Sequence, residues 1–334
     1  MKYQVFPLSP ENYQRHLIHT RERNWVETNC YVDVLIELLH GWGFEPVAAL
    51  PFTVGIDFEG DQWTFFKFPH GDLRELFGLE IQELAVWRPL VSHVEEQIAL
   101  GRPVLVELDS FYLPDTAGTA YQLAHTKSTV AAIAIDVEAR RLGYFHGQGY
   151  YELHGDDFDN VFRTKGFEDP AFLPPYVEIV KRRQFAMSRA ELVRTSLDLL
   201  RKQLEWLPER NPFESFKDRF ARDLTWLANE PLEVFHQYSF ATWRQFGACY
   251  ELTAVYLRWL ADHGVPGLEP ALAPFEELST SARTIQFQLA RAMARKKPLD
   301  LSTLDRMGDL WNNALGQLLR SEALRHPELA LSSG

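Results

Sequence analysis

Residues able to perform nucleophilic catalysis occur at three places in the chain. Cys30 begins a predicted apolar helix, Asn24 lies six residues before it, and His125 precedes a predicted strand far downstream. A thiol at a helix N-terminus lies at the positive end of the helix dipole, which favours the reactive thiolate. An amide side chain shortly upstream can donate to an oxyanion, and a distant His can act as the base. The pattern predicts an enzyme with a cysteine nucleophile.

The helix that would position the thiol is predicted over residues 30–40, CYVDVLIELLH. It is apolar nearly all round, and Asp33, Glu37 and His40 form one narrow polar stripe at helical spacing. Two glycines and a proline shortly after it end the helix. We therefore expect a mostly buried helix that presents Cys30 at its first turn.

The predicted strands follow this helix in the sequence. Residues 104–109 read as a buried strand that ends at Asp109, and residues 129–135 read as a second apolar strand. The segment LGYFHGQGYYEL reads as one returning strand. Upstream, FTVGIDF and WTFFKF flank residues 59–62 and predict a hairpin, and short helices are predicted near residues 72–77 and 88–100.

The loop after the first of these strands contains candidate substrate-binding residues. Asp109 ends the strand and Tyr112 follows within the loop, and loops at strand ends often carry substrate contacts. A carboxylate that caps the following turn is an equally good interpretation of Asp109. Both interpretations stay open.

Composition excludes several classes of protein. The chain has 334 residues, 46% hydrophobic and 13% aromatic, which predicts a folded globular protein with sizeable cores. Its formal charge of −12 disfavours nucleic acids and anionic membranes as partners. The two cysteines, Cys30 and Cys249, are interpreted as reduced thiols, and no apolar signal core or membrane span is apparent. We expect a soluble cytoplasmic protein.

The pattern changes near Pro170–Pro175, where consecutive prolines interrupt regular structure. Helical periodicity dominates from Ser188 onward. The predicted fold is α+β, with a catalytic domain over residues 1–180 and an α-helical bundle domain over residues 181–334. The tryptophans of the second half are predicted to lie in the bundle core: Trp206, Trp226, Trp243, Trp259 and Trp311.

The run GRPVLVELDSFYLPDTAGTAYQLAH, with the upstream Cys30 helix and the following apolar strand, is similar to the N-terminal domain of the butirosin biosynthesis protein H family. That family has a papain-like cysteine-peptidase fold but works as an acyltransferase. The chain also resembles, still more closely, an uncharacterised bacterial family of domains of unknown function with a helical C-terminal half. The resemblance covers roughly residues 20–320.

The resemblance implies acyl or aminoacyl transfer from a carrier-protein thioester, through Cys30, to a small-molecule amine or hydroxyl acceptor. It implies His125 as the base, Asn24 at the oxyanion position, and His146 as the nearest match to the residue that orients the base. Gln148 and Glu152 stay open as alternatives for that last role. Two departures from the family pattern are the segment Thr126-Lys127-Ser128 after His125 and the absence of an Asp or Asn at the orienting position.

Two other functions remain open. The same site with water as acceptor would be a thioesterase or amidase, and a chain with an unreactive Cys30 would be a scaffold that only binds the loaded carrier. The cysteine and histidine spacings match no metal site, and no glycine-rich phosphate loop occurs. We therefore expect no metal and no cofactor other than the phosphopantetheine of the carrier.

Overall fold

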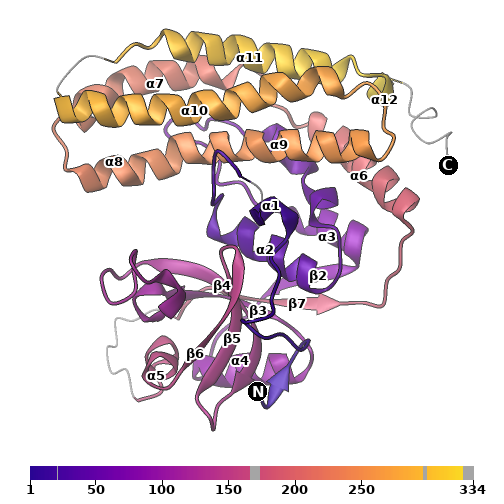
Figure 1. The fold of residues 1–334 in the computed structure, drawn as a ribbon, viewed down its shortest axis with the longest axis vertical. Coiled ribbons are helices and arrows are strands. Elements are labelled where there is room, and N and C mark those ends of the chain that lie inside the picture. Colours follow the sequence, from indigo (N-terminus) through magenta and orange to yellow (C-terminus); the bar gives the residue numbers. More distant parts are fainter. Residues whose placement is uncertain (21, 166–173, 296–298, 326–334) are drawn as a thin grey trace. The chain divides into compact units, whose positions relative to one another are not determined.

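The structure is a computed structural model that describes residues 1–20, 22–165, 174–295 and 299–325. The chain is α+β and forms two compact units (Figure 1). Unit 1 comprises Met1–Arg21, Asn29–Pro46 and Leu73–Ala186, and unit 2 comprises Glu22–Thr28, Val47–Asp72 and Met187–Gly334. The predicted domains were two contiguous segments, whereas unit 2 also takes two stretches from the N-terminal part. Part of the predicted boundary near Pro170–Pro175 lies outside the described residues.

Unit 1 is built on an antiparallel sheet with strand order β2-β7-β3-β4-β5-β6, and β1 pairs with β4. Within the described residues the strands are β1 (Tyr3–Gln4), β2 (Leu79–Glu83), β3 (Val104–Asp109), β4 (Lys127–Asp136), β5 (Arg141–His146), β6 (Gly149–His154) and β7 (Val177–Arg182). The central strands β3 and β4 are apolar on both sides because helices pack on both faces of the sheet. The structure establishes an antiparallel sheet with helices that cover it.

The helices of unit 1 divide between the two faces. Helix α2 (Cys30–Gly41) packs on β4, β5 and β6, and α4 (Leu90–Ala99) packs on β1, β3 and β4. The remaining elements are α1 (Leu17–Thr20), α3 (His70–Phe77), which the chain enters from unit 2, α5 (Asp156–Phe162), and the 3-10 turns η3 (Ser110–Tyr112) and η4 (Pro114–Thr116). We call the two sides of the sheet the α2 face and the α4 face.

Strand alternation assigns side chains to these faces. Val104, Val106 and Leu108 share one apolar core with the buried residues of α4, so they lie on the α4 face. Their neighbours on β3 therefore point to the α2 face. Residues directly opposite in the register share a face, so Thr129, which pairs with Glu107, also lies on the α2 face.

Unit 2 is helical. Its helices are α6 (Arg189–Leu204), α7 (Pro212–Leu227), α8 (Leu232–Ser239), α9 (Gln245–Asp262), α10 (Glu269–Arg295), α11 (Ser302–Leu319) and α12 (Glu322–Arg325), with 3-10 turns η1 (Pro46–Ala49) and η2 (Pro51–Gly55) and a π-helical segment, Phe240–Arg244. Helix α10 packs along α9 and α11, and α11 packs on α7 (Figure 1). Helix α6 begins at a capping box, in which Ser188 and Glu191 satisfy each other's backbone N–H groups. The predicted helical C-terminal region is confirmed.

Several predicted elements differ from the structure. The predicted hairpin around residues 59–62 is reduced to one bridge between Phe58 and Trp63, because residues 51–55 form η2 and the Trp63 ring packs among the phenylalanines of α7 and α9. The single returning strand is two strands, β5 and β6, joined by a tight turn at Gly147. Strands β2 and β7 were not predicted.

The prediction that five tryptophans fill the bundle core is wrong for two of them. Trp206 is 82% exposed and Trp226 is 49% exposed, whereas Trp243 is fully buried. Both exposed rings lie near helix ends or on the outer face of an amphipathic helix, where the apolar pattern alone overstates burial.

Candidate functional site

Cys30 is the first residue of α2 and is only half-buried. The Asn29 side chain caps the helix by accepting from the backbone N–H of Val32 at 2.9 Å. The Cys30 thiol donates to Thr129 Oγ1 on β4 at 3.7 Å, which places it against the α2 face. Cys30 therefore begins the helix at the predicted position.

His125 forms a pair with Asp109. Its Nδ1 lies 2.7 Å from Asp109 Oδ2, and its ring stacks on Phe111 with centroids 4.3 Å apart. The side chain of His125 is 64% exposed, so its other nitrogen is open to a ligand. Asp109 also accepts from the Phe111 backbone N–H at 3.1 Å, so it caps the turn and holds His125 at once. Tyr112 lies beside this pair, with its ring centroid 6.1 Å from that of His125.

Cys30 and the His125–Asp109 pair lie on the same face and near the same end of the sheet, and among the described residues no hydrogen bond joins Cys30 to His125. Thr129 lies four positions after His125 in the sequence, which corresponds to about 13 Å of strand. Lys127, which lies between His125 and Thr129 in the sequence, forms an ion pair with Glu107 of β3. In the described conformation the candidate nucleophile therefore contacts Thr129, and the candidate base contacts Asp109.

His146 lies on the opposite face. It pairs in register with Val130 of the α4-face core, and its Nε2 lies 2.7 Å from Ser128 Oγ. Its Nδ1 lies 2.5 Å from Asp115 Oδ2, and Tyr144 donates to the other oxygen of that carboxylate. Ser128 and Thr129 are adjacent on a strand, so their side chains point to opposite faces. His146 is thus placed to act with Ser128, and it does not orient His125.

Asn24 belongs to unit 2. Its backbone N–H donates to Glu251 Oε1 at 2.7 Å, and its side-chain Nδ2 donates to Thr280 Oγ1 at 3.1 Å. Glu251 also accepts from Arg23 and from the backbone of Trp25, so one carboxylate fixes the segment around Asn24. The oxyanion role of Asn24 stays a prediction.

Family comparison accounts for both halves of the chain. The DUF1839 N-terminal domain matches residues 14–182, and the DUF1839 C-terminal domain matches residues 189–320. The chain belongs to the DUF1839 family. Among curated proteins, none matches the chain. The prediction of an uncharacterised family with a helical C-terminal half is confirmed at this level.

Within the DUF1839 N-terminal domain, the polar stripe of α2 is buried rather than exposed. His19 lies between two carboxylates, with its Nε2 3.2 Å from Asp33 Oδ1 and its Nδ1 bonded to Glu37. Glu37 also accepts from the Tyr13 hydroxyl and from the His16 backbone N–H. The side chains of His19 and Glu37 are fully buried.

The pKa values of His19 and Tyr13 are both raised in this network. Burial opposes the charge of His19, but hydrogen bonds and charge from Asp33 and Glu37 outweigh burial and raise the pKa of His19. Burial, followed by the charge of Glu37, raises the pKa of Tyr13 far above its usual range. The network ties the N-terminal segment to the helix that carries Cys30.

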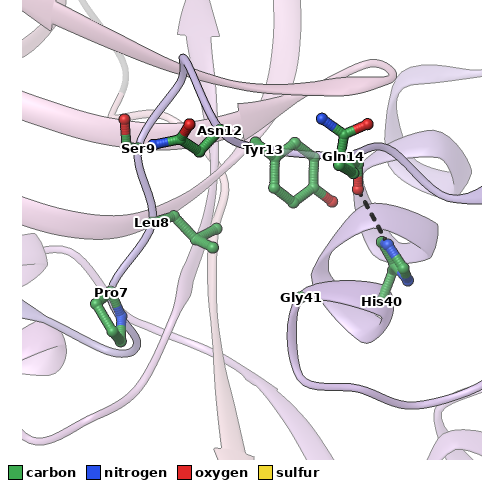
Figure 2. A pocket seen from close by; sticks show the side chains of 8 residues that line it. All are labelled: Pro7, Leu8, Ser9, Asn12, Tyr13, Gln14, His40 and Gly41. Atoms are coloured by element: carbon green, nitrogen blue, oxygen red, sulfur yellow. Dashed lines mark hydrogen bonds between the residues drawn. The ribbon is translucent and has the colours of Figure 1, made fainter.

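A pocket of about 570 Å³ lies at the other end of the same helix. It is lined by Pro7, Leu8, Ser9, Asn12, Tyr13, Gln14, His40 and Gly41, and His40 Nε2 bonds to the Gln14 carbonyl (Figure 2). His40 follows Cys30 by ten residues, which is about 15 Å along a helix. The pocket is therefore remote from the candidate nucleophile.

The second cysteine of this DUF1839 chain differs sharply from the first. Cys249 is fully buried in α9, where its thiol donates to the Thr53 carbonyl at 3.3 Å. Burial raises the pKa of Cys249 well above its usual value. This thiol is a core residue.

Among the described residues, no group of three or more His, Cys, Asp and Glu side chains is arranged to hold a metal ion. None of the helices formed by those residues is long and apolar enough to cross a membrane.

Sequence reasoning missed Asp115, Ser128 and His19 as site residues. Asp115 follows Pro114 in a short loop, and Ser128 was noted only as an interruption between His125 and the apolar strand. Their partners come from different elements, so no spacing in the chain identifies them. For His19, neither its position in the chain nor the polar stripe of α2 indicated that it would pair with Asp33 and Glu37.

Proposed function

We propose that unit 1 transfers acyl or aminoacyl groups from a thioester on a carrier protein to an amine or hydroxyl acceptor, through a thioester on Cys30. The observation that carries the proposal is the position of Cys30. It is a half-buried thiol at a capped helix N-terminus, on the same sheet face as the His125–Asp109 pair. The resemblance to the butirosin biosynthesis protein H family supports the donor class, and phosphopantetheine would present the acyl group.

Each residue has a distinct role in this proposal. The Cys30 thiolate attacks the thioester carbonyl, the new C–S bond forms, and the carrier leaves as its own thiolate. The helix N-terminus supplies N–H groups and a positive potential for the oxyanion. His125, with Nδ1 held by Asp109, takes a proton from the acceptor as the acceptor attacks the Cys30 thioester.

The proposal imposes a structural requirement. Because about 13 Å of strand separates His125 from Thr129, which Cys30 contacts, the proposal requires the base to approach the thiol when donor and acceptor bind. His125 belongs to a loop, residues 122–126, in which every residue is exposed. Few buried contacts therefore resist that movement.

The decisive experiment uses the full chain and a carrier protein loaded with a radiolabelled acyl or aminoacyl group. The wild type should acquire a label that neutral hydroxylamine removes, as expected of a thioester, and Cys30→Ala should acquire no label of this hydroxylamine-sensitive kind. His125→Gln and Asp109→Asn should still become labelled but should pass the label to an amine acceptor more slowly, by about 10²-fold or more for His125→Gln. Cys249→Ala is the matched thiol control and should behave like the wild type.

Other outcomes identify the alternatives. Rapid release of free acid without acceptor, if Cys30→Ala abolishes it, would identify a thioesterase that acts through Cys30. If the wild type forms no adduct yet binds the loaded carrier as tightly as Cys30→Ala does, the protein is a binding scaffold. Among the described residues no hydrogen bond joins Cys30 to His125, and this favours the scaffold as the second candidate.

A further inference from the structure

We propose that Ser128, His146 and Asp115 form a second nucleophilic centre, independent of Cys30, that hydrolyses carboxylic esters and thioesters. The Ser128 hydroxyl lies 2.7 Å from His146 Nε2, and Asp115 Oδ2 lies 2.5 Å from His146 Nδ1. These are the contacts that a Ser-His-Asp triad needs, and triads are recognised by geometry and roles rather than by order in the chain.

The hydrogen-bond partners fix the direction of proton flow. Burial, followed by the charge of Asp115, raises the pKa of Tyr144, so its hydroxyl stays protonated and donates to Asp115 Oδ1. An ionised Asp115 can only accept, so His146 must donate from Nδ1. In a neutral imidazole held this way, Nε2 carries the lone pair and accepts from the Ser128 hydroxyl, which is the tautomer that a general base requires.

Burial also follows the pattern of a working triad. The side chains of Asp115 and His146 are only 6% and 11% exposed, which shields the carboxylate and fixes the ring. Ser128 is partly exposed and lies at the start of β4, directly after exposed loop residues. A substrate carbonyl can therefore reach the hydroxyl while the acid stays covered.

The scaffold positions the three side chains through separate elements. Val130 and His146 are directly paired across β4 and β5, so Ser128, two residues before Val130, is the diagonal neighbour of His146 on the same face. Asp115 comes from η4, next to Leu113, whose side chain is part of the α4-face core. Regular strands hold two of the three groups, and a buried anchor holds the third.

The reaction balances with water alone. Ser128 Oγ bonds to the acyl carbon as its proton passes to His146 Nε2, and the bond to the alcohol or thiol breaks as that group takes the proton from His146. Water then attacks the Ser128 ester, giving its proton to His146, and the free acid leaves as Ser128 regains the proton. Asp115 stabilises the imidazolium in both halves and acts as a positioning residue.

The test uses a fluorophosphonate probe on the full chain. Serine attack forms an O–P bond and releases fluoride, so the wild type should be labelled at Ser128 and Ser128→Ala should not. His146→Gln should slow labelling by about 10²-fold or more, and Asp115→Asn should slow it similarly. Ser92→Ala, on α4 of the same unit, is the matched serine control and should be labelled like the wild type. A merely structural Asp115 would leave the pH profile of labelling unchanged in Asp115→Asn.

A second variant guards against loss of folding. Ser128→Cys should gain an iodoacetamide-reactive thiol whose reaction slows when His146→Gln is added. Absence of labelling in the folded wild type, or equal labelling with and without His146, would overturn the proposal. Failure here is distinct from failure of the Cys30 proposal, because a Ser128 ester resists neutral hydroxylamine and the Cys30 adduct does not.

Discussion

Glu37→Gln tests whether the buried polar network behind Cys30 holds the N-terminal segment in place. Glu37 receives hydrogen bonds from the Tyr13 hydroxyl, the His16 backbone and the His19 ring, and its side chain is fully buried. Glutamine has the same shape but presents an NH₂ group to one of these donors and removes a negative charge beside His19. The substitution therefore leaves a buried donor facing another donor.

The expected loss follows from burial. Breaking a buried ion pair by removing one partner costs about 3–5 kcal/mol in unfolding free energy. For a unit of this size, each 1 kcal/mol corresponds to about 2–4 °C in Tm, so Glu37→Gln should lower Tm by roughly 6–20 °C. Glu83→Gln, at an exposed position on β2, is the matched control and should change the unfolding free energy by less than about 0.5 kcal/mol.

The pH dependence supplies a second signature. The folded-state pKa of His19 is raised above its unfolded value of about 6.5, so its stabilisation is fully present below that pH. It is lost as pH rises through the folded-state pKa. The difference in unfolding free energy between wild type and His19→Gln should therefore shrink as pH rises from 6.5. Urea unfolding at constant ionic strength measures it.

Two results would refute this reasoning. One is a Glu37→Gln protein whose Tm falls by no more than that of the control. The other is a wild-type advantage over His19→Gln that grows with pH, since that would mean that His19 is buried as the neutral form.

Three further outcomes follow from the same structure. Iodoacetamide should modify Cys30 in the folded chain and spare Cys249, and both should react after denaturation, as peptide mass spectrometry would record. Asp109→Asn should lower the unfolding free energy by less than about 1 kcal/mol, because its partner His125 is largely exposed; a larger loss in urea unfolding would contradict the surface-pair argument. Tyr144→Phe should cost about 1–3 kcal/mol in the same assay, since it removes a donor from a buried carboxylate, and no loss would show that water replaces it.

The local elements around the site were predictable because their patterns are strong. The strand ending at Asp109 has the predicted bounds, and the helix beginning at Cys30 starts at the predicted residue. Both are short apolar runs with clear boundaries, where periodicity and capping agree. The turn at Gly147 was missed although a two-residue turn with glycine, at φ +50°, is a recognised hairpin signal.

Interactions between elements were not predictable. The polar stripe on α2 was interpreted as a narrow feature of a buried helix, and nothing in the stripe indicated that His19 would enter it. The hairpin around residues 59–62 failed for the same reason. The aromatic residues that would have lined its strands pack instead on α7 and α9, so tertiary packing overrode strand propensity.

The parity of β4 explains why the site histidines separate. Asp109, which holds His125, and Thr129 both lie on the α2 face, whereas Ser128 directly precedes Thr129 on β4 and points to the α4 face with His146. A single strand thus carries a cysteine-facing position and a histidine-bound serine on its two sides. Because the two side chains point to opposite faces of the sheet, a substitution that removes the chemistry on one face leaves the nucleophile on the other face in place. That separation is what makes the Cys30 and Ser128 proposals independently testable.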